Sequence, residues 1–359
     1  MESYGNRMIP YRPNLILVHD QSWQDDTTHG ILERLPGVEV QTIHDRNISS
    51  YGKNALVLMR YPGRFLRNCQ GSGAEICCNY FVVSYAWNCH MECTYCILRS
   101  YLNNEALVVC TNFEDLLWEV GETLRLNPAG TFRIGTGELA DSLALDHITC
   151  FSRKLVPFFA SLPNAILELK TKSDQISNLK NLDHGGHTVI SWSMNSKRIC
   201  CTEEFKTATF EERIAAALQC QKWGYKLGFH FDPIIYYEGW ESEYRDAVRE
   251  IFSAIDPGTV AWISLGALRF PPHLREIVRR QFPKSRVPCG EFVPGHHGKL
   301  RYFRPIREEI YRKMKAWIHE EAPQVFVYLC MENRLVWQRS FGESPRDATH
   351  LSDQMDLLI

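Results

Sequence analysis

The sequence lacks the segments that would take a protein into or across a membrane. Its 359 residues contain no run of 18 or more apolar residues, the length that a membrane-spanning helix needs. The opening stretch, MESYGNRMIPYRPN, has no basic start followed by an apolar core and a small-residue cleavage site, so no signal peptide is evident. We therefore expect a cytoplasmic protein without a membrane partner.

The chain also lacks a large excess of charge of either sign. Its formal net charge is −2, and it has no long block of like charge, no internal repeat and no low-complexity tract. A protein that coats nucleic acid non-specifically is usually basic, so any nucleic-acid contact here must come from a local patch. With 45% hydrophobic and 23% charged residues, the composition is that of a globular protein with a substantial core.

What the sequence does have is 13 cysteines, three of them within eight residues. Cys89, Cys93 and Cys96 follow the spacing C-x3-C-x2-C, and no fourth cysteine or second C-x2-C pair lies nearby. Structural disulfides are rare in the cytosol, so clustered thiols there indicate metal binding or redox chemistry. The other ten show no ligand spacing, and most are expected to be buried small side chains.

The spacing alone leaves three interpretations of this triplet open. A structural zinc site normally has four closed ligands, which would require His90 beside the thiols. A redox pair would need only Cys93 and Cys96. Three thiolates suit a four-iron cluster in which one iron has no protein ligand, because such clusters usually take four cysteines. The missing cysteine would then leave a position for a substrate or cosubstrate.

Strands and helices alternate along most of the chain. About six strand–helix units in a row predict a parallel sheet, either open or closed into a partial (β/α)6 barrel. The expected strands cover residues 80–87, 106–111, 131–137, 165–172, 188–194, 226–235 and 260–270. The expected helices cover residues 112–126, 145–162, 174–182, 209–224, 240–255 and 271–282, with Asn112 and Thr209 as N-caps.

These patterns divide the chain into three parts. Residues 1–78 are expected to form a small α/β unit and a linker. Residues 79–285 form the region that contains the loop of Cys89, Cys93 and Cys96, which we call the cysteine loop. Residues 286–359 are expected to form a hairpin, a helix and a strand. The last 20 or so residues are polar and are expected to be frayed. In parallel α/β folds chemistry gathers at the carboxyl ends of strands, and the cysteine loop directly follows such a strand.

The cysteine loop after a first barrel strand, with Tyr95 just before the last cysteine, resembles the radical S-adenosylmethionine superfamily. The resemblance implies a partial (β/α)6 barrel and a [4Fe–4S] cluster on Cys89, Cys93 and Cys96. In that superfamily the open iron binds S-adenosylmethionine, and one electron splits its S–C5′ bond to give a 5′-deoxyadenosyl radical that abstracts hydrogen. The resemblance also implies an electron donor such as flavodoxin or ferredoxin.

Other strand ends fit the same resemblance. The sequence GTGE resembles the superfamily's glycine-rich segment that holds the amino group of S-adenosylmethionine, although alone it would indicate only a turn. Lys172 would alone be a solvated strand end. In a parallel barrel all these strand ends face one mouth. The residues implied to bind the cosubstrate are Tyr95, Gly135, Gly137, Glu138, Lys172, Ser193 and Asn195.

From about Leu15 to Met331 the chain resembles the spore photoproduct lyase family, whose enzymes reverse a thymine–thymine ultraviolet lesion in DNA. The matching stretches are the cysteine loop, LALDHIT, TK, SMNS, GYKLGF, YEGW and LRF. Glu138 stands where these lyases carry their hydrogen-donor cysteine, and Ile97 where they carry a tyrosine. We therefore expect poor repair unless another donor has taken over. The catalytic candidates are Glu138, Asp232 and Cys330.

The stretch GEFVPGHHGKLRYFRP corresponds to the hairpin with which the lyases open damaged DNA. Its cations alternate with aromatic residues, which suits phosphate contacts and base stacking. The nucleic-acid candidates are Lys299, Arg301, Tyr302 and Arg304. The alternative is a solvated hairpin whose aromatic rings pack on the core.

Two other functions stay open from the sequence. A radical enzyme that acts on a sugar or natural product, for example an epimerase, would need a hydrogen donor on the opposite face of its substrate. Cys330, Cys289 and Cys150 are available for that role. The second is a protein that carries the cluster without catalysing a reaction.

Overall fold

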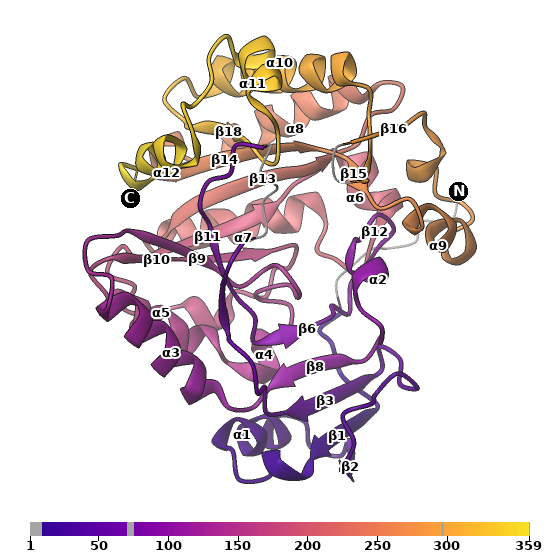
Figure 1. Ribbon diagram of the computed structural model, residues 1–359, viewed down its shortest axis with the longest axis vertical. Helices are drawn as coiled ribbons and strands as arrows, with labels where there is room; N and C mark the ends of the chain where they lie inside the picture. Colours follow the sequence, from indigo (N-terminus) through magenta and orange to yellow (C-terminus); the bar gives the residue numbers. More distant parts are fainter. Residues whose placement is uncertain (1–8, 70–74, 296–297, 359) are drawn as a thin grey trace.

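A curled sheet of eight strands forms the centre of the molecule in the computed structural model, which describes residues 9–69, 75–295 and 298–358 (Figure 1). Its strands are β4 (Leu66–Asn68), β5 (Phe81–Val83), β9 (Phe132–Gly135), β10 (Ala165–Thr171), β11 (Thr188–Ser193), β13 (Lys226–Ile234), β14 (Val260–Ala267) and β18 (Val327–Leu329). They lie in the order β18-β14-β13-β11-β10-β9-β5-β4, and all neighbours are parallel except β4 and β5. The sheet is the partial barrel that the alternation in the sequence predicts.

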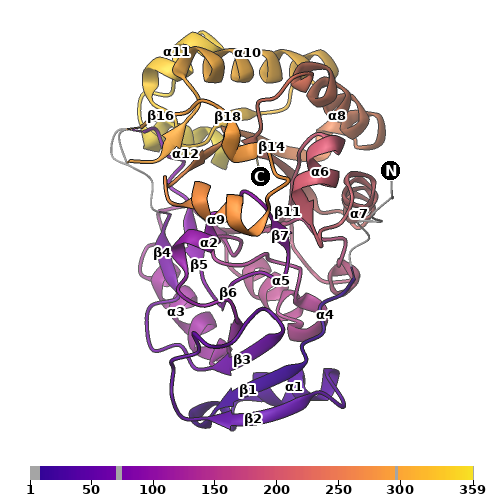
Figure 2. The same ribbon diagram turned by 90° about the vertical axis from the view of Figure 1, so that its right-hand side faces the viewer.

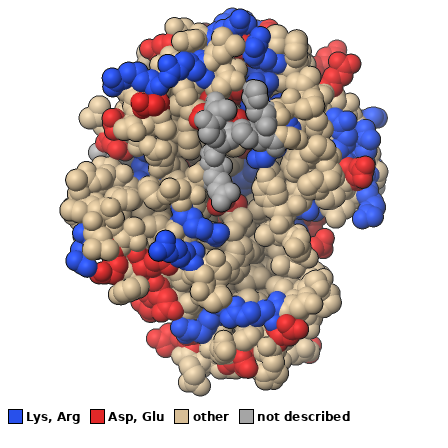
Figure 3. Space-filling view, viewed as in Figure 1, with Lys and Arg blue, Asp and Glu red and all other residues tan. Residues whose placement is uncertain are grey.

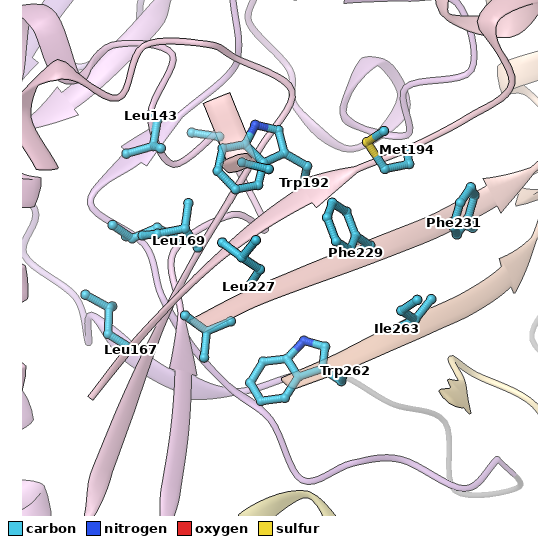
Figure 4. Close-up of a cluster of buried hydrophobic side chains, with 14 of the residues drawn as sticks. Leu143, Leu167, Leu169, Trp192, Met194, Leu227, Phe229, Phe231, Trp262 and Ile263 are labelled. Carbon is cyan, nitrogen blue, oxygen red and sulfur yellow. The ribbon is translucent and has the colours of Figure 1, made fainter. Parts of the chain in front are cut away.

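The central strands form because their apolar residues are buried within this sheet. Leu169 of β10, Trp192 of β11, Phe229 of β13 and Ile263 of β14 belong to one cluster of buried side chains (Figure 4). The register pairs Trp192 with Phe229 across β11 and β13. Parallel strands covered by helices need such nearly continuous apolar runs, which accounts for the sequence pattern.

Helices connect the strands and cover the outer face of the curled sheet (Figures 1 and 2). They include α3 (Phe113–Arg125), α6 (Lys197–Glu203), α7 (Phe210–Lys222) and α8 (Trp240–Ala254), while α9 (Leu274–Gln281) lies beside α2 (Leu98–Tyr101) (Figure 1). The predicted N-cap Thr209 begins α7 and forms a capping box, because Thr209 and Glu212 each accept a hydrogen bond from the other's backbone amide. Within the described ranges, no helix combines the length and apolar character that crossing a membrane would require.

Two of the expected helices differ from the prediction. Residues 145–162 form two helices, α4 (Asp146–Thr149) and α5 (Ser152–Ala160). The break falls at Cys150, whose φ of 53° is left-handed and ends α4. The expected helix 174–182 is wrong, since only a 3-10 turn over Ser177–Leu179 is present there.

A second sheet of five strands lies at one end of the molecule, at the bottom of Figure 1. Its strands are β1 (Leu15–His19), β2 (Glu39–Ile43), β3 (Ala55–Met59), β6 (Ala86–Trp87) and β8 (Leu107–Cys110), in the order β2-β1-β3-β8-β6, and α1 (Asp26–Arg34) connects β1 to β2. The expected strand 80–87 is therefore two strands, β5 and β6, in different sheets. The three-part division of the chain stays a prediction, but this sheet draws strands from both sides of residue 78.

The C-terminal region is more ordered than the sequence predicts. After α10 (Arg304–Glu321) and β18, the chain forms α11 (Arg334–Phe341) and α12 (Ala348–Asp356). The expectation of a frayed end is wrong for α12, because Leu351 and Met355 are buried and Arg133 of β9 binds Asp356 and the carbonyl of Ser352. The segment is mostly polar, but its two buried apolar residues, Leu351 and Met355, are enough to pack α12 against the protein.

Candidate active site

The cysteine loop runs between β6 and α2 (Leu98–Tyr101) and contains a two-residue strand, β7 (Glu92–Cys93). This strand, labelled in Figure 2, pairs antiparallel with β12 (Glu204–Phe205), so that Cys93 lies opposite Glu204. The amide of Cys96 donates to the carbonyl of Cys93 at 3.2 Å, which folds the loop back on itself. Cys93 is buried, whereas Cys89 and Cys96 are partly exposed.

The positions of the three loop cysteines fit a four-iron cluster better than a site for a single metal ion. In the described part of the chain, no three Cys, His, Asp or Glu side chains are grouped so as to hold one metal ion. A four-iron cluster does not require this, because each thiolate binds a different iron. Burial raises the pKa of Cys89 to about 12 and also raises that of Cys93, an effect that bound iron cations would offset. Three cysteines on one short loop therefore fit such a cluster.

A buried carboxylate, Glu204, gathers the polar residues beside the cysteine loop. Its Oε1 accepts hydrogen bonds from Lys172 Nζ at 3.0 Å and Asn195 Nδ2 at 3.1 Å, and from the hydroxyl of Tyr95. Its Oε2 accepts from Arg213 Nη2 at 2.6 Å. The structure thus brings together Tyr95, Lys172 and Asn195, although their contact with a cosubstrate stays a prediction. We refer to these five residues as the Glu204 cluster.

The Glu204 cluster holds charge inside the protein. The side chains of both Glu204 and Arg213 are 0% exposed. Burial alone would raise the pKa of Glu204, but the charges of Arg213 and Lys172 and the hydrogen bond from Tyr95 hold it well below its usual value. Arg213 also donates to the carbonyl of Ser193 at 2.9 Å, at the end of β11. The cluster therefore fixes the ends of two barrel strands next to the cysteine loop.

The glycine-rich segment follows β9 at the same sheet. A Cβ atom on Gly135 would lie 1.6 Å from the hydroxyl oxygen of Tyr80, and one on Gly137 would lie 3.1 Å from the carbonyl oxygen of Lys170. Gly135 therefore has no room for a side chain, whereas at Gly137 a Cβ atom would require its neighbours to shift slightly. Glu138 follows with an exposed side chain. The structure explains the glycines by packing, and a cosubstrate contact for the segment stays a prediction.

A cavity inside the curled sheet brings the three catalytic candidates together. Glu138 follows β9, Asp232 belongs to β13 and Cys330 follows β18, and all three line the cavity. The other lining residues are Cys69, Glu75, Ile76, Cys77, Cys78, Tyr80, Val82, Gly137, Glu168, Lys170, His230, Ser264, Tyr328, Leu329 and Met331. Cys150 lies between α4 and α5, and Cys289 is exposed in a 3-10 turn, so neither belongs to this lining.

Asp232 is not a free carboxylate in this cavity. Its two oxygens accept hydrogen bonds from Arg269 Nη1 at 2.9 Å and Nη2 at 3.0 Å. Arg269 Nη2 also lies 3.7 Å from the sulfur of Cys330. A bidentate pair of this kind fixes the planes of both groups. Asp232 therefore positions Arg269, which in turn contacts Cys330.

The Asp232–Arg269 pair should make stability depend on pH. Burial alone would raise the pKa of Asp232, but Arg269 lowers it from 3.8 to about 2. A lowered folded-state pKa means that this contribution is present above about pH 4 and lost as the pH falls through about 2. We expect Asp232→Asn to lower the free energy of unfolding by about 2 kcal/mol at neutral pH.

Denaturant unfolding of Asp232→Asn and unchanged protein at several pH values measures this effect. The difference between them should shrink steadily between about pH 4 and about pH 2, because protonated aspartate then resembles asparagine. A difference that stays constant over this range would contradict the assignment of the lowered pKa to Asp232.

A second buried pair, Glu168 and His230, lines the cavity and was missed by the sequence reasoning. Glu168 Oε1 lies 2.7 Å from His230 Nε2 and accepts from Ser191 at 2.5 Å, while Tyr80 donates to Oε2. Burial alone would raise the pKa of Glu168, but His230 and these hydrogen bonds lower it to about 2. The available signal was a polar residue with an apolar neighbour on each side in both strands, Glu168 in AILELKT and His230 in KLGFHFDPI.

The hairpin candidates for nucleic-acid contact are divided between buried and exposed positions. β16 (Val293–Pro294) and β17 (Leu300–Arg301) form a small sheet with β15 (Arg269–Phe270). The side chain of Arg301 is 11% exposed and donates to Glu75 at 2.8 Å. Tyr302 is buried and its hydroxyl accepts from a backbone amide. Both residues therefore hold the hairpin to the rest of the protein. For Tyr302 this agrees with the alternative interpretation, in which the aromatic rings of the hairpin pack on the core.

Two of the four hairpin candidates keep access to solvent. Arg304 is 44% exposed, and Lys299 is partly exposed, with its ammonium group 5.9 Å from the ring centre of Tyr101. The tip of the hairpin, residues 296–297, lies outside the described residues. On the face shown in Figure 3, Lys and Arg are interspersed with Asp and Glu. Among the four described candidates, Lys299 and Arg304 are therefore the ones placed to reach a phosphate group.

A partial barrel of parallel strands with a three-cysteine loop beside its strand ends defines a radical S-adenosylmethionine enzyme. A sequence profile described as spore photoproduct lyase matches residues 72–330. The chain belongs to the spore photoproduct lyase family.

Curated relatives and solved structures agree with this family. The chain is 23% identical over 313 residues to the spore photoproduct lyase of Geobacillus sp. (strain Y412MC61), covering 85% of this chain and 89% of the relative. It is 22% identical over 316 residues to that of Bacillus subtilis (strain 168), covering 84% and 92%. A solved lyase variant with bound AdoMet and dinucleoside spore photoproduct superimposes with a TM-score of 0.81 at 22% identity, over 90% of this chain and 100% of that one.

Proposed function

We propose that this enzyme repairs a thymine photoproduct in DNA by radical chemistry. The observation that carries the proposal is the Glu204 cluster beside the cysteine loop, at the strand ends of a barrel whose interior cavity is lined by three catalytic candidates. Membership of the spore photoproduct lyase family supplies the substrate class. Solved relatives bind a dinucleoside spore photoproduct, which supports a lesion of that size in the cavity.

The cofactors follow from the same residues. Cys89, Cys93 and Cys96 would hold a [4Fe–4S] cluster, and S-adenosylmethionine would lie between it and the cavity. When bound, these groups supply a 5′-deoxyadenosyl radical that removes hydrogen from the substrate. In this proposal Lys172 and Asn195 orient the cosubstrate, because Glu204 fixes both at the mouth of the barrel.

The proposal is tested by anaerobic incubation of the reduced, reconstituted enzyme with a dinucleotide spore photoproduct. Restored thymine that depends on S-adenosylmethionine is the expected result. Cleavage of S-adenosylmethionine without any loss of the lesion, together with turnover of a sugar or natural product, would favour the non-nucleic alternative. Gel-shift binding to irradiated and undamaged DNA gives an independent comparison.

The cluster needs an electron from outside the protein, and a surface pocket suggests where it enters. Cys89 and Cys96 line this pocket together with Lys53 and Arg99. We place there an acidic one-electron carrier such as flavodoxin or ferredoxin, because Lys53 and Arg99 outweigh the charge of Glu105 in the same lining and attract negative charge. A lowered rate of cluster reduction by such a carrier in Arg99→Ala, with unchanged reduction by dithionite, would support this placement.

Glu138 is proposed to bind the amino group of S-adenosylmethionine. A carboxylic acid cannot return hydrogen to a carbon radical, but a carboxylate makes a charge-assisted hydrogen bond to an ammonium group. We expect Glu138→Ala to weaken S-adenosylmethionine binding by about 1.5–3 kcal/mol, roughly a tenfold to hundredfold loss in affinity. Equilibrium binding to the reconstituted enzyme measures this. Glu138→Gln should lose less, and equal affinity in Glu138→Ala and unchanged protein would remove Glu138 from the site.

The hairpin gives a prediction that separates DNA contact from structural support. We expect Arg304→Ala to weaken binding to lesion-containing duplex DNA and to reduce the salt slope by about one, because one phosphate contact is lost. Arg301→Ala should instead lower the free energy of unfolding, since it leaves Glu75 without its partner. Fluorescence anisotropy at several salt concentrations measures the first effect. An unchanged salt slope in Arg304→Ala would argue against phosphate contact there.

A further inference from the structure

Four cysteines from separate parts of the chain meet in the cavity that Glu138 lines. Cys69, Cys77 and Cys78 come from the segment around β4 and β5, and Cys330 follows β18. The backbone joins these segments, because Ile76 and Glu332 form an isolated antiparallel bridge. None of the four cysteines has a spacing that marks it in the sequence. Their shared position in one cavity is a property of the tertiary structure alone.

The protein holds both the backbone and the sulfur of Cys330 in place. Its amide donates to the carbonyl of Leu265 at 2.9 Å, which fixes its backbone against β14. Its sulfur lies 3.7 Å from the guanidinium of Arg269, which the bidentate bond to Asp232 holds in place. Burial raises the pKa of Cys330 to about 12, so at neutral pH it carries the S–H bond that hydrogen-atom transfer requires.

The other three thiols form a hydrogen-bonded group of their own. The interaction of Cys77 with Cys69 and Cys78 lowers the pKa of Cys77 and raises the pKa values of the other two thiols. Cys69, Cys77 and Cys78 are therefore engaged with one another. Cys330 is instead held by its backbone bond to Leu265 and by the contact of its sulfur with Arg269, so its position in the cavity is defined. This defined position makes Cys330 the thiol best suited to donate.

We propose that Cys330 returns the hydrogen atom to the substrate radical. It would take over the role of the donor cysteine that the lyases carry at the position of Glu138. This inference rests on the proposed repair function. In the step, the S–H bond of Cys330 breaks homolytically, a C–H bond forms on the substrate carbon, and a thiyl radical remains on the sulfur. One electron from the one-electron carrier and one proton from solvent restore the thiol, so atoms and electrons balance.

The test is a single-turnover assay of Cys330→Ala with the dinucleotide lesion in D2O. We expect 5′-deoxyadenosine to form at a rate within about twofold of the unchanged enzyme, because hydrogen abstraction does not use this thiol. Thymine formed per 5′-deoxyadenosine should fall by at least about tenfold, and adducts of the unquenched radical should appear instead. Solvent deuterium, which the unchanged enzyme should transfer to thymine through an S–D bond, should be lost from the product.

Controls separate this role from a structural one. Cys289→Ala, which alters an exposed thiol outside the cavity, should retain both thymine yield and deuterium transfer. Cys330→Ser, which keeps the size of the side chain but has no weak S–H bond, should fail as Cys330→Ala does. Full thymine yield with deuterium in Cys330→Ala would overturn the proposal, as would loss of deuterium only in Cys69→Ala or Cys78→Ala.

Two further outcomes distinguish this inference from the function on which it rests. If the unchanged enzyme cleaves S-adenosylmethionine but never consumes the lesion, the repair function is wrong. The donor role of Cys330 then falls with it, because no substrate radical forms. If reconstituted protein holds clearly more than four irons per chain and the excess disappears in Cys77→Ala, the cavity thiols bind metal and the donor role is overturned.

Discussion

Cys93→Ala is expected to lose reductive cleavage of S-adenosylmethionine by more than about a hundredfold, because a four-iron cluster with only two thiolates is not retained. Cys93 is the buried member of the triplet and lies opposite Glu204 in the β7–β12 pair. Anaerobically purified unchanged protein should be brown and hold about four irons per chain. The variant should be nearly colourless. Iron analysis and the yield of 5′-deoxyadenosine under dithionite measure both effects.

The matched control for this variant is Cys289→Ala, which removes an exposed thiol far along the chain from the loop. It should keep the full iron content and cleavage rate. Cys89→Ala and Cys96→Ala should behave like Cys93→Ala, since each thiolate serves its own iron. Metal analysis of the unchanged protein that found zinc and no iron would end the assignment of the triplet to an iron–sulfur cluster.

Glu204→Ala is expected to lower the free energy of unfolding by about 3–5 kcal/mol, because it leaves the charge of Arg213 buried without its partner. Both side chains are fully buried, and the distance between Arg213 Nη2 and Glu204 Oε2 is 2.6 Å. Denaturant unfolding of the protein without its cluster measures the loss. Glu204→Gln should lose less, because the amide oxygen still accepts hydrogen bonds. It should nevertheless bind S-adenosylmethionine more weakly, since Lys172 loses its ion pair.

A surface ion pair provides the comparison for Glu204. Glu211 pairs with Lys197 at 2.9 Å, and both side chains are about half exposed or more. Glu211→Ala should therefore change the free energy of unfolding by no more than about 1 kcal/mol. If Glu204→Ala and Glu211→Ala had equal effects, the Glu204 cluster would not have the structural role that its burial indicates.

The cysteine triplet and the alternation of strands with helices could be predicted because both depend on residues close together in the chain. Three thiols within eight residues must lie near one another whatever the fold, and the strands of the sheet are nearly continuous apolar runs. The capping box at Thr209 and Glu212 is local in the same way. Such features depend on the spacing of residues along the chain and on helical or extended periodicity. Both can be read directly from the order of the residues.

Contacts between distant residues could not be predicted in this way. Tyr95 and Glu204 are 109 positions apart, and nothing near Glu204 in the sequence marks it as the partner of Tyr95 and Lys172. Arg301 looked like a free cation among aromatic residues, yet its guanidinium binds Glu75, which is 226 positions away. A charged side chain has the same appearance in a sequence whether water or a buried partner satisfies it.

Local patterns were enough to predict the parallel α/β architecture and the three-thiol loop after a strand, because periodicity and spacing are properties of neighbouring residues. Three features could be seen only once the chain was folded: residues 80–87 contribute to two sheets, α12 docks on β9, and Cys330 shares a cavity with Glu138. These features arise from the packing of segments far apart in the chain. The free energy that selects such packing comes from burying apolar surface and pairing buried charges, and it depends on which segments meet.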